Sequence, residues 1–292
     1  MTSSDSRRPW TLLLMAAAFL VMVTLGIRQS FGLFLLPVTE ALGTGREVFS
    51  LALALQNLLW GIASPFAGAL ADKFGAGRVA AIGTLFYAGG LVVMASFVSP
   101  SGLMMGQLMI GIGLGSAGVS IALGAVARAV APEKRSLALG MVTSIGSFGQ
   151  FAVLPVTQIF IDGYGWQVSL LLLSGLSASM LASCLLMARD EKVREVRTAD
   201  IANITMNGML KTALSSTDYL LLTVGFFVCG IQVVFIATHL PTYLQDAGIG
   251  PEIASWALGL VGLFNIIGSL LAGWLGSFVS KAKLLAWQYL TR

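Results

Sequence analysis

The chain has 292 residues, of which 57% are hydrophobic and only 10% are charged, and its formal net charge is +4. Soluble domains have about 25% charged and 45–50% apolar residues. This composition excludes a single water-soluble globule, and the charge gives no support for nucleic-acid binding.

Eight apolar runs are near or above the ~20 residues that cross a bilayer as a helix. In chain order they cover residues 10–36, 48–71, 79–98, 102–127, 137–160, 167–188, 219–243 and 253–280. The first run is longer than the apolar part of a signal peptide and has no convincing cleavage site after it. We therefore predict an all-α integral membrane protein, embedded in a lipid bilayer, with about eight transmembrane helices.

The basic residues indicate how these helices are oriented. With the N-terminus in the cytoplasm, the connections at 72–78, 128–136, 189–217 and 281–292 lie inside and hold nearly all of the Lys and Arg residues. Only Arg46 then falls in an outer connection. The positive-inside rule favours this orientation. We expect a multi-pass protein of a bacterial-type inner (plasma) membrane with a cytoplasmic N-terminus.

The first run contains Arg28, the only charge predicted to lie well inside a span. An arginine near the bilayer centre costs about 2.5–3.5 kcal/mol on insertion scales, so it should face a wet cavity or a partner. No Asp or Glu lies near the middle of any predicted span. Three explanations remain open: an anionic ligand held by the guanidinium fork, a structural partner, or outward snorkelling. A ligand site would combine Arg28 with other polar groups in the spans, namely Gln29, Gln56, Gln232 and His239.

The connection between the second and third runs reads GALADKFGAGR, residues 68–78. Gly68 would allow close helix approach, and Asp72 at the membrane edge could pair with a cation or cap a neighbouring helix. Lys73 and Arg78 could serve only to set the topology, but the positive-inside rule requires no aspartate.

No cofactor or metal is expected. The sequence GLGSAG at residues 113–118 matches G-x-G-x-x-G, but it lies inside an apolar run and follows no predicted strand, so close helix packing explains it better. The chain has one histidine, which excludes a cluster of histidine ligands. His239 precedes Tyr243 by one helical turn and could carry a coupling proton, or be an interfacial histidine bonded to a neighbour.

Residues 189–217, beginning RDEKVREVR, carry too many charges to cross a membrane. They predict a cytoplasmic linker between an N-terminal six-helix bundle, residues 1–188, and a partial C-terminal bundle, residues 218–292. The second bundle repeats the first. Aligning Glu47 with Glu252 also aligns Ser50 with Ser255, Ser64 with Ser269, and Gly68 with Gly273.

The duplication and the 68–78 connection together resemble the major facilitator superfamily. Its loop signature between helices two and three is matched by Gly68, Leu70, Asp72, Lys73, Gly75 and Arg78, whereas Ala76 and Gly77 depart from it. The resemblance implies a transporter that rocks two six-helix halves about a central site. It also implies that Gly68, Asp72, Lys73, Gly75 and Arg78 form a gate that latches the halves on the cytoplasmic side. Eight helices of an implied twelve predict a C-terminally truncated chain.

Helix one, GIRQSFGLFLLPV, and helix seven, GIQVVFIATHLPTYL, resemble the monocarboxylate and oxalate–formate porters. This resemblance implies alternating-access transport of a small organic anion, coupled to protons or a counter-substrate. Drug efflux is an alternative, but Gln107 stands where drug–proton antiporters of the family typically carry an arginine, and no glycine precedes Pro155. A nonfunctional remnant of a transporter gene is a further alternative. A lipid enzyme would need an acid–base or nucleophile cluster, and none is readable.

Overall fold

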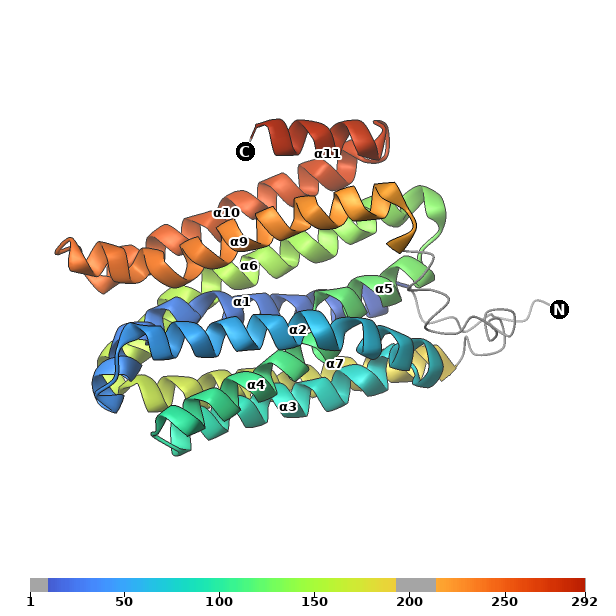
Figure 1. Cartoon of the computed structure of the whole chain (residues 1–292). Helices are drawn as coiled ribbons and strands as arrows, with labels where there is room; N and C mark the ends of the chain where they lie inside the picture. The colour runs from blue at the N-terminus through green and yellow to red at the C-terminus, as the bar shows by residue number, and fades with distance from the viewer. Residues whose placement is uncertain (1–9, 193–213, 292) are drawn as a thin grey trace.

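The computed structural model describes residues 10–192 and 214–291, apart from the side chains of residues 10, 189–192 and 281 (Figure 1). Within these ranges the regular structure is helical and contains no strand. The helices are α1 (Trp10–Leu42), α2 (Arg46–Phe74), α3 (Ala76–Ser96), α4 (Pro100–Ala117), α5 (Val119–Ala129), α6 (Pro132–Tyr164), α7 (Trp166–Lys192), α9 (Thr217–Asp246), α10 (Pro251–Leu275) and α11 (Lys281–Leu290).

The prediction of eight membrane spans is confirmed, because the described residues contain 8 helical segments long and apolar enough to cross a membrane. The fourth span, Pro100–Ala129, consists of α4 and α5, which are separated at Gly118. The packing interpretation of the GLGSAG glycines is also confirmed. A Cβ on Gly113 would lie 2.8 Å from the backbone of Gly83, and one on Gly115 would lie 2.7 Å from the Ala63 side chain.

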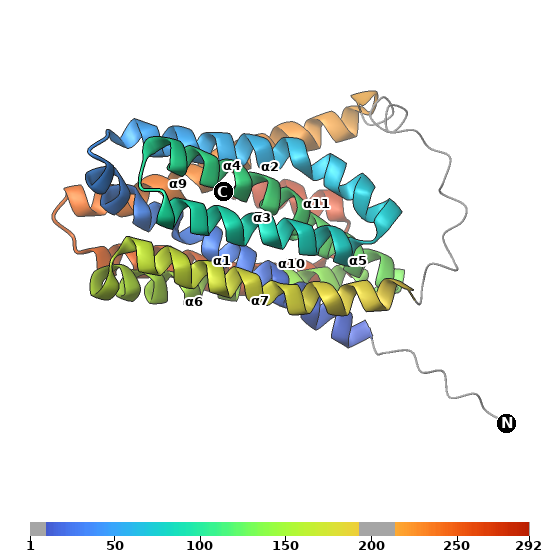
Figure 2. The ribbon, with the colours of Figure 1, turned by 90° about the horizontal axis from the view of Figure 1, so that it is seen from below.

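The helix α1 lies inside a bundle with helices α2 to α7, packed mainly against α6 and α7. Its side chains Leu20, Ile27 and Phe34 are fully buried, because α6 and α7 pack along α1 while α3 packs against α4 and α7. The helix α2 packs against α4. Figures 1 and 2 show these long helices lying side by side as one bundle.

The helix α10 lies along α6, and small residues bring the two backbones together. A Cβ added to Gly140 of α6 would lie 2.8 Å from the Cα of Gly273 in α10. Ser144 donates a hydrogen bond to the carbonyl oxygen of Ile266 at 3.1 Å. Small residues and interhelical hydrogen bonds of this kind hold membrane helices together, since lipid offers no hydrophobic driving force for their association.

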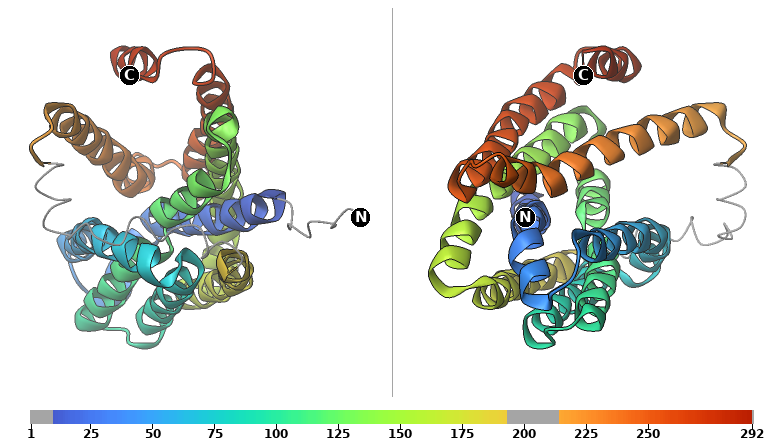
Figure 3. Two further views of the ribbon diagram at one scale, coloured as in Figure 1. Left: turned by 90° about the vertical axis from the view of Figure 1, so that its right-hand side faces the viewer. Right: turned by 60° about the vertical axis from the view of Figure 1, so that its left-hand side comes forward.

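The helix α9 contacts the bundle mainly through its C-terminal part, where its buried residues Thr238, Pro241 and Thr242 lie. Figure 3 shows that α9 diverges from α1 toward the N-terminal end of α9. The helix α7 continues to Lys192, past the end of its apolar span at Ala188. Residues 193–213 lie outside the described residues, so the division into two bundles joined by a linker stays a prediction.

Candidate functional site

A cavity lies between α1, α2 and α9, and Arg28 forms part of its wall. Its empty volume is about 300 Å³, which includes space open to solvent. The lining residues are Arg28, Phe31 and Gly32 of α1, Leu53, Gln56 and Asn57 of α2, and Val234, Ala237 and Thr238 of α9. The cavity therefore joins two helices of the predicted first half to one helix of the predicted second half.

The Arg28 guanidinium is held by two side chains of α2. Its Nη2 donates a hydrogen bond to Asn57 Oδ1 at 3.1 Å, and its Cζ lies 4.7 Å from the centroid of the Trp60 ring. Within residues 10–192 and 214–291, no carboxylate forms an ion pair with Arg28. The charge is thus partly compensated by a cation–π contact and one neutral hydrogen bond, and the remaining guanidinium N–H groups are left for other acceptors.

A second unused donor lies in the same cavity wall. The Gln56 side chain is only 1% exposed, and its Nε2 atom is buried with no hydrogen-bond partner among the described residues. Leaving such a buried donor unpaired costs about 1–3 kcal/mol. A cavity whose wall contains a cation without a carboxylate partner in the described residues and an unpaired amide donor is suited to an acceptor-rich, negatively charged ligand.

The α9 side of the cavity approaches α1 closely at Gly32. A Cβ at this position would collide with the carbonyl oxygen of Ala237, so only glycine fits without a shift of α9. The absence of a side chain on Gly32 therefore allows Ala237 and Thr238 to lie beside Arg28 and complete the cavity.

The other predicted substrate residues do not line this cavity. Gln29 is buried, and its Oε1 atom has no hydrogen-bond partner among the described residues, but Gln29 does not line the cavity. Gln232 is exposed, and the half-buried His239 packs its ring 5.1 Å from that of Phe235. A role for these three residues in substrate binding stays a prediction. Sequence reasoning missed the contacts made by Asn57 and Trp60, although Asn57 was visible as a polar residue in an apolar span.

The 68–78 connection is held by an ion pair within the first half. Asp72 Oδ1 lies 3.1 Å from Nη1 of Arg128 at the end of α5, with both side chains about half exposed or more. Lys73 and Arg78 are exposed. A Cβ added to Gly68 would meet nothing within 4 Å among the described residues, so the expected close helix approach is not seen there. The role of this connection as a gate between halves stays a prediction.

Two glycines of the same connection have a clear structural reason. Gly75 joins α2 directly to α3 with a φ of 96°, a backbone conformation that favours glycine. Gly77, where the chain departs from the loop signature, faces the backbone of Ala188 in α7 so closely that an added Cβ would clash. A larger residue at this position would displace α7.

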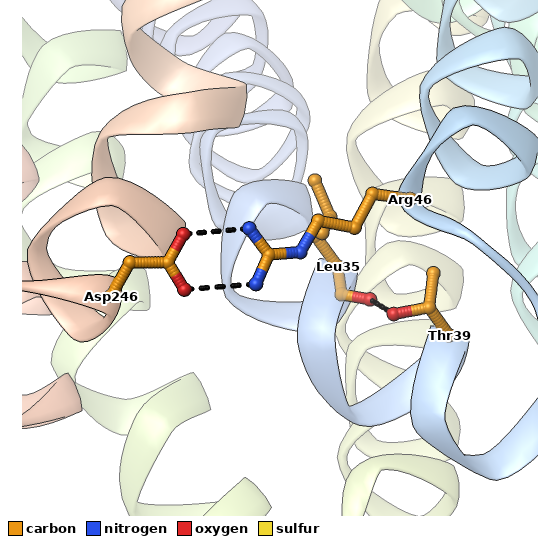
Figure 4. A network of polar contacts seen from close by, with 4 residues as sticks. All are labelled: Leu35, Thr39, Arg46 and Asp246. Carbon is orange, nitrogen blue, oxygen red and sulfur yellow. Dashed lines mark hydrogen bonds and ion pairs between the residues drawn. The ribbon is translucent and has the colours of Figure 1, made fainter.

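The N-terminal end of α2 and the C-terminal end of α9 are joined by a second ion pair, shown in Figure 4. Arg46 donates two hydrogen bonds to Asp246, from Nη1 to Oδ2 at 2.6 Å and from Nη2 to Oδ1 at 2.8 Å. Both side chains are 50% exposed. This pair links the predicted halves on the side of the membrane that is opposite to the 68–78 connection.

Long apolar helices around a charged cavity define a multi-pass membrane protein with an internal polar site. The profile of the Major Facilitator Superfamily matches residues 11–291. The chain therefore belongs to this family of transporters.

Several curated proteins are similar to the chain. An uncharacterized MFS-type transporter, YcxA of Bacillus subtilis, is 25% identical over 97% of this chain and 68% of its own length. Monocarboxylate transporter 13 of Rattus norvegicus is 27% identical over 96% of this chain and 65% of its own length. Monocarboxylate transporter 11 of Mus musculus is 27% identical over 91% of this chain and 59% of its own length. The chain thus spans about two thirds or less of the length of these relatives.

Proposed function

We propose that this protein binds a small organic anion, most simply a monocarboxylate, in the cavity at Arg28 and moves it across the membrane by alternating access. The observation that carries the proposal is the Arg28 guanidinium, which lines a cavity between α1, α2 and α9 without a carboxylate partner in the described residues. An anion that enters this cavity would supply the missing negative charge.

The chemistry of the wall supports an anion over a cation. Arg28 and the unpaired Nε2 atom of Gln56 are both donors. Their placement allows two donor groups from neighbouring helices to converge on one acceptor group, and a guanidinium can bind a carboxylate through two parallel N–H···O bonds. The names of the monocarboxylate transporters among the relatives point to the same substrate class.

The proposal extends to the transport cycle. Because the cavity is built by helices of both predicted halves, rocking one half against the other would open it to one side at a time. Coupling to protons or to a counter-substrate, with Gln29, Gln232 and His239 as further contacts in another state of the cycle, belongs to this proposal. The cytoplasmic N-terminus and the plasma-membrane location are also part of this proposal.

The test is a binding measurement on the purified 292-residue chain in lipid nanodiscs. Acetate, propanoate and lactate are compared with the cation tetraethylammonium by ligand-induced thermal stabilisation. We expect stabilisation by the carboxylates, no measurable carboxylate binding in Arg28→Gln, and roughly tenfold weaker binding in Arg28→Lys, which keeps the charge but loses the planar fork. Carboxylate affinity that is unchanged in Arg28→Gln, or stabilisation by the cation alone, would contradict the proposal.

A further inference from the structure

Two side chains of α2 determine the orientation of the Arg28 guanidinium. Asn57 and Trp60 are three residues apart on α2, a spacing that places two side chains on the same face of a helix. Asn57 Oδ1 accepts a hydrogen bond from the Arg28 Nη2 atom at 3.1 Å. The Trp60 ring covers the guanidinium at 4.7 Å from Cζ to the ring centroid. One contact anchors an Nη2 donor of the guanidinium, and the other places an aromatic ring against it.

The Asn57 amide is itself held in place. Its Nδ2 donates a hydrogen bond to the carbonyl oxygen of Leu53, one helical turn earlier, at 2.7 Å. With the amide nitrogen used in this way, the oxygen is the atom that remains to face Arg28. The chain of contacts runs from the α2 backbone through Asn57 to the guanidinium, so the position of Arg28 follows the position of α2.

We propose that Asn57 and Trp60 are positioning residues that preset the plane of the Arg28 guanidinium and thereby make the cavity select planar carboxylates over tetrahedral oxyanions. This inference rests on the proposed function, since it assumes that Arg28 binds the substrate. With Trp60 on one side and Asn57 at one Nη2 donor, an anion is left with the remaining N–H groups of the guanidinium. A carboxylate whose two oxygens lie in that plane forms two parallel hydrogen bonds.

A tetrahedral sulfonate gains less from a guanidinium of defined orientation. Its three oxygens point in three directions around the sulfur, so it forms similar contacts with many guanidinium orientations, whereas the bidentate carboxylate geometry requires a particular one. Freeing the guanidinium should therefore weaken carboxylate binding more than sulfonate binding. The ratio of the two dissociation constants measures positioning, because a general loss of folding or of positive charge would affect both anions.

The experiment compares propanoate with ethanesulfonate, which carry the same ethyl group, on the purified chain in nanodiscs. Asn57→Leu removes the acceptor at nearly constant volume, Trp60→Leu removes the aromatic face, and Trp60→Phe keeps one. We expect the dissociation constant for propanoate to rise roughly tenfold in Asn57→Leu and Trp60→Leu, with a smaller rise for ethanesulfonate, so that selectivity falls. Trp60→Phe should retain most of the selectivity.

Matched controls come from α10. Asn265 contacts Gln150 at 3.5 Å and Trp256 packs 5.9 Å from the Phe151 ring, and neither contacts Arg28. We expect Asn265→Leu and Trp256→Leu to leave the selectivity ratio unchanged. An equal loss for both anions in Asn57→Leu and Trp60→Leu, or no loss, overturns the positioning role.

The same series separates the two proposals. Propanoate binding that survives Arg28→Gln, or that is absent in the unmodified chain, overturns the proposed function. Binding that is lost in Arg28→Gln while the selectivity ratio is unchanged in Asn57→Leu and Trp60→Leu leaves the proposed function standing and overturns only the positioning inference.

Discussion

Arg46 and Asp246 are 200 positions apart in the sequence, yet their side chains form a bidentate ion pair with N···O distances of 2.6 and 2.8 Å. The pair joins the first residue of α2 to the last residue of α9. It joins two of the three helices that line the Arg28 cavity.

We expect the Arg46 and Asp246 pair to contribute modestly to stability. Both side chains are half exposed, so solvent screens the charges and the pair adds little to the free energy of unfolding. A double-mutant cycle with Arg46→Gln and Asp246→Asn, measured by thermal unfolding in detergent, should give a small but favourable coupling free energy. The exchanged pair Arg46→Asp with Asp246→Arg should restore much of the stability that the single charge removals lose. High salt should reduce the coupling free energy. A coupling that salt does not change would contradict an electrostatic origin.

The Asp72 carboxylate provides a second prediction. Asp72→Asn should retain membrane insertion, because insertion follows hydropathy and the Lys and Arg bias, but it should lose most transport in a reconstituted uptake assay. Arg128→Gln should cause a similar loss, since Arg128 pairs with Asp72 at 3.1 Å. Lys134→Gln is the control, because Lys134 lies outside the 68–78 connection, is exposed and makes no ion pair among the described residues. Normal uptake by Asp72→Asn would remove the latch hypothesis.

The packing of α6 against α10 should be sensitive to a single methyl group. A Cβ on Gly140 would lie 2.8 Å from the Cα of Gly273, so Gly140→Ala must push the helices apart and should cost about 1–3 kcal/mol. Gly175 of α7 has nothing within 4 Å of an added Cβ. Gly175→Ala should therefore be neutral or slightly stabilising. Thermal unfolding of both variants in detergent tests this, and equal stabilities would contradict the close α6–α10 contact.

The proposed orientation can be tested by cysteine labelling. In a background in which Cys184 and Cys229 are replaced by alanine, Ser101→Cys lies at the start of α4 and Lys134→Cys lies near the start of α6. Both positions are exposed. A membrane-impermeant maleimide added to intact cells should label Ser101→Cys and not Lys134→Cys, and permeabilisation should expose both. The reverse pattern would place the N-terminus outside.

Much of the fold follows from the sequence alone. A span needs ~20 apolar residues because of the bilayer thickness, and that requirement is local in sequence, so the spans could be read from hydropathy. Arg28 stood out for a similar reason, since a charge in an apolar run is costly wherever the helices pack. The positive φ of Gly75, by contrast, was not predicted from the sequence, where this glycine was noted only as a match to the loop signature.

The contacts around Arg28 were decided only by the tertiary structure. Which neighbour a residue in a membrane helix meets depends on the rotation and the vertical position of each helix, and a nearly uniform apolar sequence leaves both undetermined. That is why Trp60, one aromatic among many apolar residues, covers the guanidinium, while Gln29, next to Arg28 in sequence, does not line the cavity. The ion pair between Arg46 and Asp246 could not be predicted from the sequence for the same reason. It depends on how α2 and α9 are placed relative to each other, and neither segment alone indicates it.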